Sequence, residues 1–414
     1  MISQVYPPDP ASVGQHMHDA AAEMARRGWA VRVLASARGY DDPSMKYPSR
    51  ETLDGVSVRR LPLSSFGKGS IAVRLAGGFI FTVLAAVRGV FTRRVDAIVV
   101  STSPPMAPIA AIAVSVVRRA PILFWVMDLN PDQMIALGKT TERSIPSRLF
   151  NLMNRAILRR AKRVVVLDRF MARRVNRKVD VSDKLDVAPP WPHEDHAEPV
   201  EHANNPFRRE HALEGVFVVM YSGNHSPANP LDTILAAAER LADRDDIRFL
   251  FVGGGLEKQK IEDAVARGAR NILSLPYQPI DSLRHSLSAA DAHLVTLGDE
   301  VVGVVHPCKV YGAMAVARPI LFVGPEPSHV SDLLADESIG VRVAHGDVDG
   351  AVRAVETLAA MPPDQRRAMG ERARAVITGR LSKASLCGGF CDAIESMAGR
   401  TPSANAAIPE APAP

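Results

Sequence analysis

The chain has 414 residues, of which 47% are apolar and 23% are charged. This length exceeds one typical hydrophobic core and fits two domains. The composition is ordinary for a globular protein and excludes disorder of the whole chain. A net charge of +5 favours anionic partners but does not choose among nucleic acid, membrane surfaces and phosphorylated ligands.

The cysteines and the N-terminus bear on the compartment. Cys308, Cys387 and Cys391 form neither a CxxC pair nor an even disulfide framework, so we expect a reducing, cytoplasmic environment. Cys387 and Cys391 share one face of an expected helix, which favours core packing over redox chemistry. Residues 1–10 lack the basic segment and apolar core of a secretory signal.

The first half of the chain indicates a parallel α/β sheet, because short apolar runs alternate with helix-length segments. The expected buried strands cover residues 31–36, 97–102, 122–127 and 164–167. An opening strand at 2–6 is shorter than a central strand normally is. We therefore expect that the natural chain starts upstream of Met1.

A second α/β series follows a segment, residues 189–205, that is rich in proline, histidine and acidic side chains and lacks periodicity. Its expected strands cover residues 216–221, 247–252, 292–297, 320–323 and 340–343. Its expected helices cover residues 231–241, 256–266, 310–316, 348–360 and 384–397. The fold class is thus α/β, with two Rossmann-like halves.

The expected domain organisation follows from these two series. It consists of an N-terminal domain 1–188, a linker 189–215, a C-terminal domain 216–380, a C-terminal helix 381–400 that packs back on the N-terminal domain, and a disordered tail 401–414.

Two features bear on membranes and nucleic acid. The apolar run 75–87 is shorter than the ~20 residues of a spanning helix, so it is expected to lie on a bilayer rather than cross one. Basic residues are dense over 155–178 with little aromatic interleaving, which argues against nucleic acid. With 71–91, Arg93 and Arg94 they favour docking on an anionic bilayer; a solvated helix face is an equally good interpretation.

Ligands of open α/β sheets sit beyond the carboxyl ends of strands, so loops that follow strands are the candidate sites. Gly14 lies near the start of the first helix, where a missing side chain lets amides approach a phosphate. Asp128 ends a strand and is placed to orient an acceptor hydroxyl or take its proton. A turn glycine and an Asx turn are the structural alternatives.

Three further loops belong to the second half. Ser222, Gly223 and Asn224 follow one strand, and Gly253 and Gly254 begin a glycine run after the next. That run lacks the full GxGxxG spacing, and close backbone packing explains it as well.

The third of these loops joins His306, Pro307, Cys308 and Lys309 to a helix start. An ammonium, an imidazole and helix-start amides together favour a pyrophosphate site. A capping loop with a solvated lysine is the alternative. No metal is expected, because the histidines near the linker, His193, His196, His202 and His211, lack ligand spacing.

These motifs resemble glycosyltransferase family 4, of the GT-B fold, and especially bacterial colanic-acid and O-antigen fucosyl- or N-acetylfucosaminyltransferases. The resemblance covers nearly the whole chain. It rests on Tyr6-Pro7-Pro8-Asp9 with Gly14, Asp128-Leu129-Asn130-Pro131-Asp132, Tyr221-Ser222-Gly223-Asn224, Val252-Gly253-Gly254-Gly255 and Pro307-Cys308-Lys309-Val310-Tyr311.

The resemblance implies that the C-terminal domain binds a UDP- or GDP-sugar and the N-terminal domain binds the acceptor, with parallel sheets facing an interdomain cleft. It implies transfer with retention, without cofactor or metal, to a lipid-linked glycan in cell-surface polysaccharide synthesis, at the inner face of the plasma membrane. The implied catalytic residues are Asp128, His306 and Lys309. The implied donor-binding residues are Gly14, Ser222, Gly223, Asn224, Gly253, Gly254, Tyr277, Gln278, Pro307 and Cys308.

Two departures leave the donor open. The glutamate that commonly binds the donor ribose is replaced by Gly312, and Val304 stands where an upstream glutamate often lies. Cations that many members carry after the Gly223 position are also missing, which leaves Lys309 to supply most of the charge. A sugar-nucleotide epimerase and a catalytically silent nucleotide-sugar-binding protein remain as alternatives.

Overall fold

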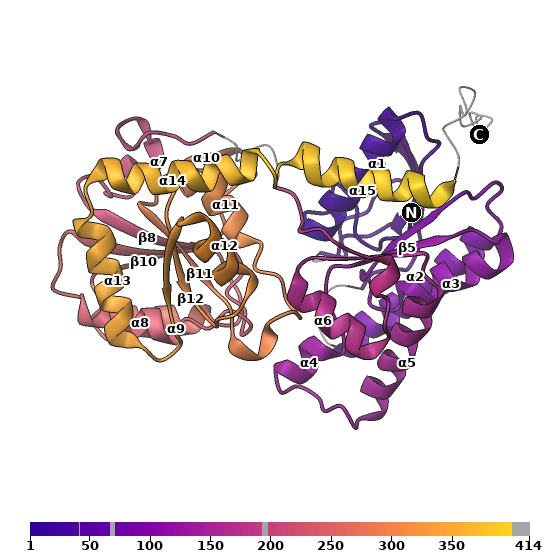
Figure 1. Ribbon diagram of the computed structural model, residues 1–414, viewed down its shortest axis with the longest axis horizontal. Coiled ribbons are helices and arrows are strands. Elements are labelled where there is room, and N and C mark those ends of the chain that lie inside the picture. Colours follow the sequence, from indigo (N-terminus) through magenta and orange to yellow (C-terminus); the bar gives the residue numbers. More distant parts are fainter. Residues whose placement is uncertain (41, 67–70, 193–197, 400–414) are drawn as a thin grey trace. The chain divides into compact units, whose positions relative to one another are not determined.

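The computed structural model describes residues 1–40, 42–66, 71–192 and 198–399. The chain divides into two compact units (Figure 1). Unit 1 comprises Met1–Pro190 and Leu386–Pro414, and unit 2 comprises Trp191–Ser385. The expected tail 401–414 and residues 193–197 of the expected linker lie outside the described residues. Each unit is an α/β body with a largely parallel sheet, which confirms the predicted fold class.

The sheet strands of unit 1 form two groups, in the orders β1-β3-β2 and β4-β5-β6-β7. Their bounds are β1 Arg32–Ser36, β2 Arg50–Leu53, β3 Val56–Leu61, β4 Ile98–Ser101, β5 Ile122–Val126, β6 Arg163–Val166 and β7 Leu185–Val187. All pairs are parallel except the β2–β3 hairpin. Ile2 bridges the two groups, because it pairs with Leu34 and with Val100. The expected strand at 2–6 is therefore reduced to this isolated pairing.

The helices of unit 1 flank this sheet. They are α1 Ser12–Arg26, α2 Ile71–Val90, α3 Ala107–Arg118, α4 Asp132–Ala136, α5 Ile145–Arg160, α6 Arg169–Lys178 and the C-terminal α15 Lys383–Ala398. The apolar run at 75–87 lies within α2, which has 20 residues. The helix is therefore longer than the apolar run indicated.

Helix α15 is fastened to the end of α1 although the two are distant in sequence. The Arg27 guanidinium donates to the carboxylates of Asp392, at 2.6 Å, and Glu395, at 2.9 Å. The Trp29 indole N–H donates to Glu395 at 2.8 Å. Cys387 and Cys391 lie buried on the inner face of α15, which confirms that they are core residues.

Unit 2 has one parallel six-stranded sheet in the order β10-β9-β8-β11-β12-β13. The strands are β8 Phe217–Ser222, β9 Ile247–Val252, β10 Ile272–Leu275, β11 Ala292–Thr296, β12 Ile320–Val323 and β13 Gly340–Val343. The helices are α7 Pro206–Glu210, α8 Asp232–Arg240, α9 Lys258–Ala266, α10 Ile280–Ser288, α11 Lys309–Ala315, α12 His329–Glu337, α13 Val348–Ala360 and α14 Pro363–Thr378. The chain starts in the middle of the sheet at β8, runs outward to β10 and returns to the other side of β8 at β11.

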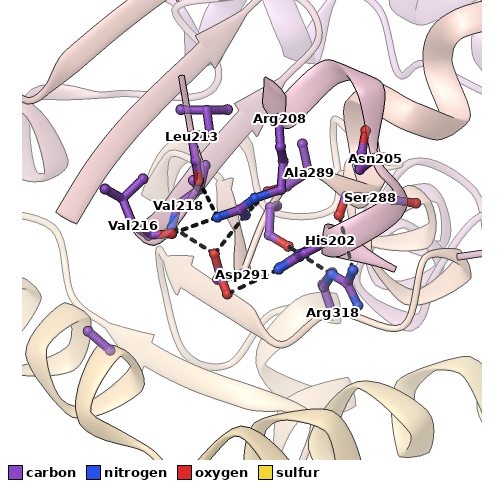
Figure 2. A network of polar contacts seen from close by, with 12 residues as sticks. His202, Asn205, Arg208, Leu213, Val216, Val218, Ser288, Ala289, Asp291 and Arg318 are labelled. Atoms are coloured by element: carbon purple, nitrogen blue, oxygen red, sulfur yellow. Dashed lines mark hydrogen bonds and ion pairs between the residues drawn. The ribbon is translucent and has the colours of Figure 1, made fainter. Parts of the chain in front are cut away.

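A buried polar network fixes α7 to the amino ends of β8 and β11 (Figure 2). Arg208 on α7 donates to the Asp291 carboxylate at 3.0 Å and to the backbone carbonyls of Leu213 and Val216. The same carboxylate oxygen of Asp291 accepts the backbone N–H of Val218 at 3.0 Å. Part of the segment expected to be a linker therefore belongs to the packed body of unit 2.

We expect Asp291→Ala to lower the free energy of unfolding of unit 2 by ~3–5 kcal/mol, because the Arg208 charge stays buried without its counterion. Calorimetric thermal unfolding of the full chain checks this. The control is Glu239→Ala, which breaks a surface pair with Arg267 at 2.6 Å and should shift the midpoint far less. Equal shifts for the two variants would contradict the assigned role of the network.

Candidate functional site

The strand order of unit 2 creates one topological switch point, between β8 and β11, where successive connections leave in opposite directions. In open parallel sheets, such a point at the carboxyl ends of the strands is where ligands bind. The loop after β8 carries Ser222, Gly223 and Asn224, and the segment after β11 leads through His306 to Lys309. The sheet thus brings two of the loops predicted from sequence to one edge.

The loops after β8 and β9 are packed backbone to backbone. The N–H of His225 donates to the carbonyl of Gly254 at 2.8 Å. A Cβ on Gly253 would lie 2.1 Å from the Gly223 carbonyl oxygen, and a Cβ on Gly255 would lie 2.4 Å from the Asn224 amide oxygen. Gly223, Gly253 and Gly255 also have positive φ, which favours glycine. Close packing therefore explains the glycine run without any ligand.

Lys309, the first residue of α11, lies against the β8 loop. A Cβ on Gly223 would lie 2.9 Å from the Lys309 Cε, so a larger residue would make the lysine side chain shift from this position. The Lys309 ammonium is 5.0 Å from the centroid of the Tyr221 ring, within the range of a cation–π contact. Burial lowers the pKa of the Lys309 ammonium to about 8. Within the described residues no carboxylate forms an ion pair with it, so its charge is available to an anion.

Lys258 and His225, which were not predicted as site residues, lie close to Lys309. Lys258, the first residue of α9, places its ammonium 3.2 Å from the Gly253 carbonyl. His225 is fully buried, its ring centroid is 5.2 Å from that of Tyr221, and neither ring nitrogen has a hydrogen-bond partner in the described part of the chain. Desolvation, and then Lys309 and Lys258, lower the pKa of His225 to about 4. The loops after β8 and β9 therefore bring two ammonium groups, those of Lys309 and Lys258, close to His225.

The sequence signal for Lys258 was its position just after the glycine run, at the start of the next helix. The signal for His225 was its place after Asn224. Neither type of residue stands out in a sequence, because single lysines and histidines in loops are common.

His306 takes part in a buried chain of hydrogen bonds. Its Nε2 lies 2.6 Å from the Tyr311 hydroxyl, which lies 2.9 Å from Nε2 of His329 at the start of α12. The His306 and His329 ring centroids are 4.5 Å apart. These contacts tie the turn before α11 to α12 and so fix the position of Lys309.

The start of α11 offers fewer amides than expected. The N–H of Val310 donates to the Pro307 carbonyl and that of Tyr311 to the Cys308 carbonyl, so both are engaged within the turn. Cys308 is exposed. The favourable charge at this helix start therefore comes from the Lys309 side chain.

Tyr277 and Gln278 follow β10 at the same edge of the sheet. The Tyr277 hydroxyl donates to the Gly254 carbonyl at 3.2 Å, and its ring lies against Gly253 and Gly254. The residue is 59% exposed, so one face of the ring is accessible. Gln278 donates to the carbonyl of Pro276.

Gly14 and Asp128 belong to unit 1. Gly14 is buried in the first turn of α1, and a Cβ there would lie 3.0 Å from the backbone of Val5 and Tyr6. Close helix packing therefore accounts for this glycine. Asp128 follows β5, its N–H donates to the Thr102 hydroxyl at 3.1 Å, and burial raises the pKa of its carboxyl.

Comparison with known proteins covers both units. The model of the "Glycosyl transferase 4-like domain" matches residues 12–191, and that of "Glycosyl transferases group 1" matches residues 204–376. The chain is 26% identical over 288 residues to the probable glycosyltransferase WbjE of Pseudomonas aeruginosa, covering 68% of this chain and 69% of that protein.

Two further proteins are similar over most of their length. The putative colanic acid biosynthesis glycosyl transferase WcaI of Escherichia coli strain K12 is 25% identical over 330 residues, covering 75% of this chain and 79% of that protein. The solved structure of HepE from Anabaena in complex with UDP-glucose superimposes with a TM-score of 0.69 at 12% identity, covering 95% of this chain and 99% of that one. The structural likeness shows a common fold.

Proposed function

Since the chain belongs to the GT-B glycosyltransferases that combine a 4-like domain with a group 1 domain, we propose that it transfers a sugar from UDP or GDP to a lipid-linked glycan. We further propose that transfer retains the anomeric configuration and serves cell-surface polysaccharide synthesis. The name of the similar protein WcaI refers to colanic acid biosynthesis, and HepE was solved with UDP-glucose. Both facts support the proposal.

The observation that carries the proposal is the ammonium of the half-buried Lys309 beside Gly223, at the switch point of the unit 2 sheet. When the bond between the sugar C1 and the diphosphate breaks, negative charge develops on the departing phosphate oxygen. A cation fixed in a desolvated site stabilises that charge more than water does. Lys258 adds a second cation at the same edge.

The remaining residues take positioning roles in this proposal. Tyr277 presents an exposed ring face on which the base of the donor can stack. His306 and Tyr311 hold the turn that carries Lys309. Asp128, in unit 1, accepts the proton of the acceptor hydroxyl. The charge of the leaving diphosphate is carried by side chains without a metal ion.

We expect Lys309→Ala to lower kcat by ~10²–10³-fold, the usual cost of removing one group that stabilises a developing oxyanion. Release of nucleoside diphosphate from UDP- and GDP-sugars in the presence of a glycan acceptor measures it, with and without EDTA, which should not change the rate. The control is Lys260→Ala in the same unit, which should keep its turnover because that ammonium pairs with Asp232 on the surface. Near-normal turnover in Lys309→Ala, or isomerisation of the donor alone, would overturn the proposal.

The pH dependence of binding gives a second prediction. Below pH 8 the Lys309 ammonium is charged in the free protein, and as pH rises through its pKa of about 8 the charge is lost. The affinity for UDP or GDP should therefore fall above about pH 8, by up to tenfold per pH unit. His225, with a pKa of about 4, stays neutral in this range. Calorimetric titration checks the trend.

Lys309→Arg is the control for this experiment, because a guanidinium stays charged throughout the range. Its binding of UDP or GDP should be independent of pH between 7 and about 9.5. A wild-type affinity that does not change with pH would contradict a loss of the Lys309 charge near pH 8, and unchanged binding of UDP or GDP by Lys309→Ala would show that Lys309 does not contact the diphosphate.

Asp128→Asn should lower kcat by ~10²–10⁴-fold with little effect on nucleotide affinity, as expected for the loss of a general base. Because burial raises the pKa of Asp128, the wild-type rate should fall as pH drops through that raised value, where the carboxyl takes up a proton. Steady-state rates against pH and UDP binding to the variant check both parts. A variant that loses affinity and keeps its rate would refute the assignment.

A further inference from the structure

Helix α2 carries a continuous apolar stripe on its outer face. Leu75, Phe79, Val83 and Val87 recur every fourth residue and are between 41% and 59% exposed. Phe91, one residue beyond the helix, is 76% exposed. Residues four apart lie on the same side of a helix, so these side chains form one strip along its whole length.

Helix α3 packs beside α2, and α5 packs beside α3. Helix α2 packs along α3, where a Cβ on Gly89 would lie 2.4 Å from the Val114 side chain, and α5 is tied to α3 by a hydrogen bond from Arg160 to Ser115. Both helices expose further apolar side chains, namely Ile109, Val116 and Val117 on α3, and Ile145, Leu149 and Leu152 on α5. We call these eleven side chains on α2, its end, α3 and α5 the α2–α3–α5 face.

The concentration of these side chains is unusual for a protein surface. The described residues include seventeen large apolar side chains that are exposed, and eleven of them belong to the α2–α3–α5 face. Single exposed apolar residues are common, whereas a set gathered on adjacent helices marks an interaction surface.

The charges around the face are almost all positive. Residues 71–119 contain six arginines and a single acid, Asp96, and α5 contains four arginines and no acid. The exposed ones are Arg74, Arg88, Arg93, Arg94, Arg119, Arg148, Arg155, Arg159 and Arg160. Apolar side chains with arginines beside them match the acyl boundary and the headgroups of an anionic bilayer.

Two cations of the basic run at 155–178 are engaged in ion pairs. Arg163 pairs with Asp186 at 3.3 Å, and Lys178 pairs with Asp132 at 2.7 Å. The exposed arginines nearest the α2–α3–α5 face lie on α2 and α5 and on the turns after α2 and α3, while Arg173 and Arg177 on α6 are exposed as well.

Helix α2 is long and apolar enough to cross a membrane by length and composition, over Val73–Val90. Its inner face is nevertheless committed to the protein, since Phe81, Thr82 and Ala85 are buried and Gly89 gives close access to α3. Crossing a bilayer would separate α2 from α3 and expose both inner faces. The helix is therefore suited to lie in the plane of the interface.

We propose that the α2–α3–α5 face docks unit 1 on the surface of an anionic phospholipid bilayer, with the apolar stripe of α2 inserted at the headgroup boundary. This inference does not depend on the proposed sugar transfer. If both hold, the docked unit 1 works beside acceptors anchored in the same bilayer.

Vesicle flotation of the full chain tests the proposal without any substrate. Wild type should float with vesicles of phosphatidylcholine and phosphatidylglycerol at least ~10-fold more than with phosphatidylcholine alone, because each basic side chain near an anionic surface strengthens binding several-fold. Phe79→Asp with Val87→Asp should lower flotation by ~10-fold or more. Arg93→Glu with Arg94→Glu should remove most of the preference for anionic vesicles.

The matched control is Leu256→Asp, which changes an apolar side chain that is 74% exposed on unit 2 and should leave flotation unchanged. Circular dichroism and thermal unfolding verify that each variant is folded. Two results would overturn the proposal: folded wild type that does not float with anionic vesicles, or flotation that Phe79→Asp with Val87→Asp does not reduce. A dimer that dissociates in that variant, with no vesicle binding, would instead assign the face to self-association.

Discussion

The proposed site depends on one close approach, that of the Lys309 side chain to Gly223. The approach exists because β8 and β11 are neighbours in the sheet, so the loops that follow them share an edge. Gly223 has no Cβ, so the Lys309 Cε can lie against this loop without shifting. The hydrogen bonds that join His306 to Tyr311 and Tyr311 to His329 hold the turn before α11. The desolvation that lowers the pKa of Lys309 is a consequence of the same fit.

Much of the fold could be predicted from apolar runs, and the failures have physical causes. Strands β9, β12 and β13 match the predicted ranges, because each is a short run rich in branched or aromatic residues between turn signals. Strands β2, Arg50–Leu53, and β3, Val56–Leu61, were not predicted. Strand β2 is an edge strand whose burial alternates, and β3 contains two arginines that break its apolar pattern. Helix α2 was underestimated because Arg74 and Arg88 bound the apolar run, whereas the helix continues through both.

Some residues of the candidate site could be predicted from sequence and others could not. Lys309 could be found because its turn combines a proline, a cation and a helix start. Lys258 and His225 could not, since their relevance arises only when the loops after β8 and β9 pack together through the hydrogen bond from His225 to Gly254. Gly14 and Gly253 were predicted to bind the donor, but in the structure close packing explains both glycines. A sequence alone cannot distinguish a glycine required for packing from one that approaches a phosphate.

The net charge of +5 left the anionic partner undecided, and the placement of the cations is what separates the possibilities. At β8 the cations are few, partly desolvated and held by fixed backbone, an arrangement that favours a small, highly charged group such as a diphosphate. On α2, α3 and α5 they are arginines in solvent beside exposed apolar side chains. A diphosphate offers nothing to Phe79 or Val83, and a bilayer surface cannot reach an ammonium packed between Tyr221 and Gly223. In the two proposals, the two sets of cations therefore serve different ligands, and the variants proposed for one should leave binding at the other intact.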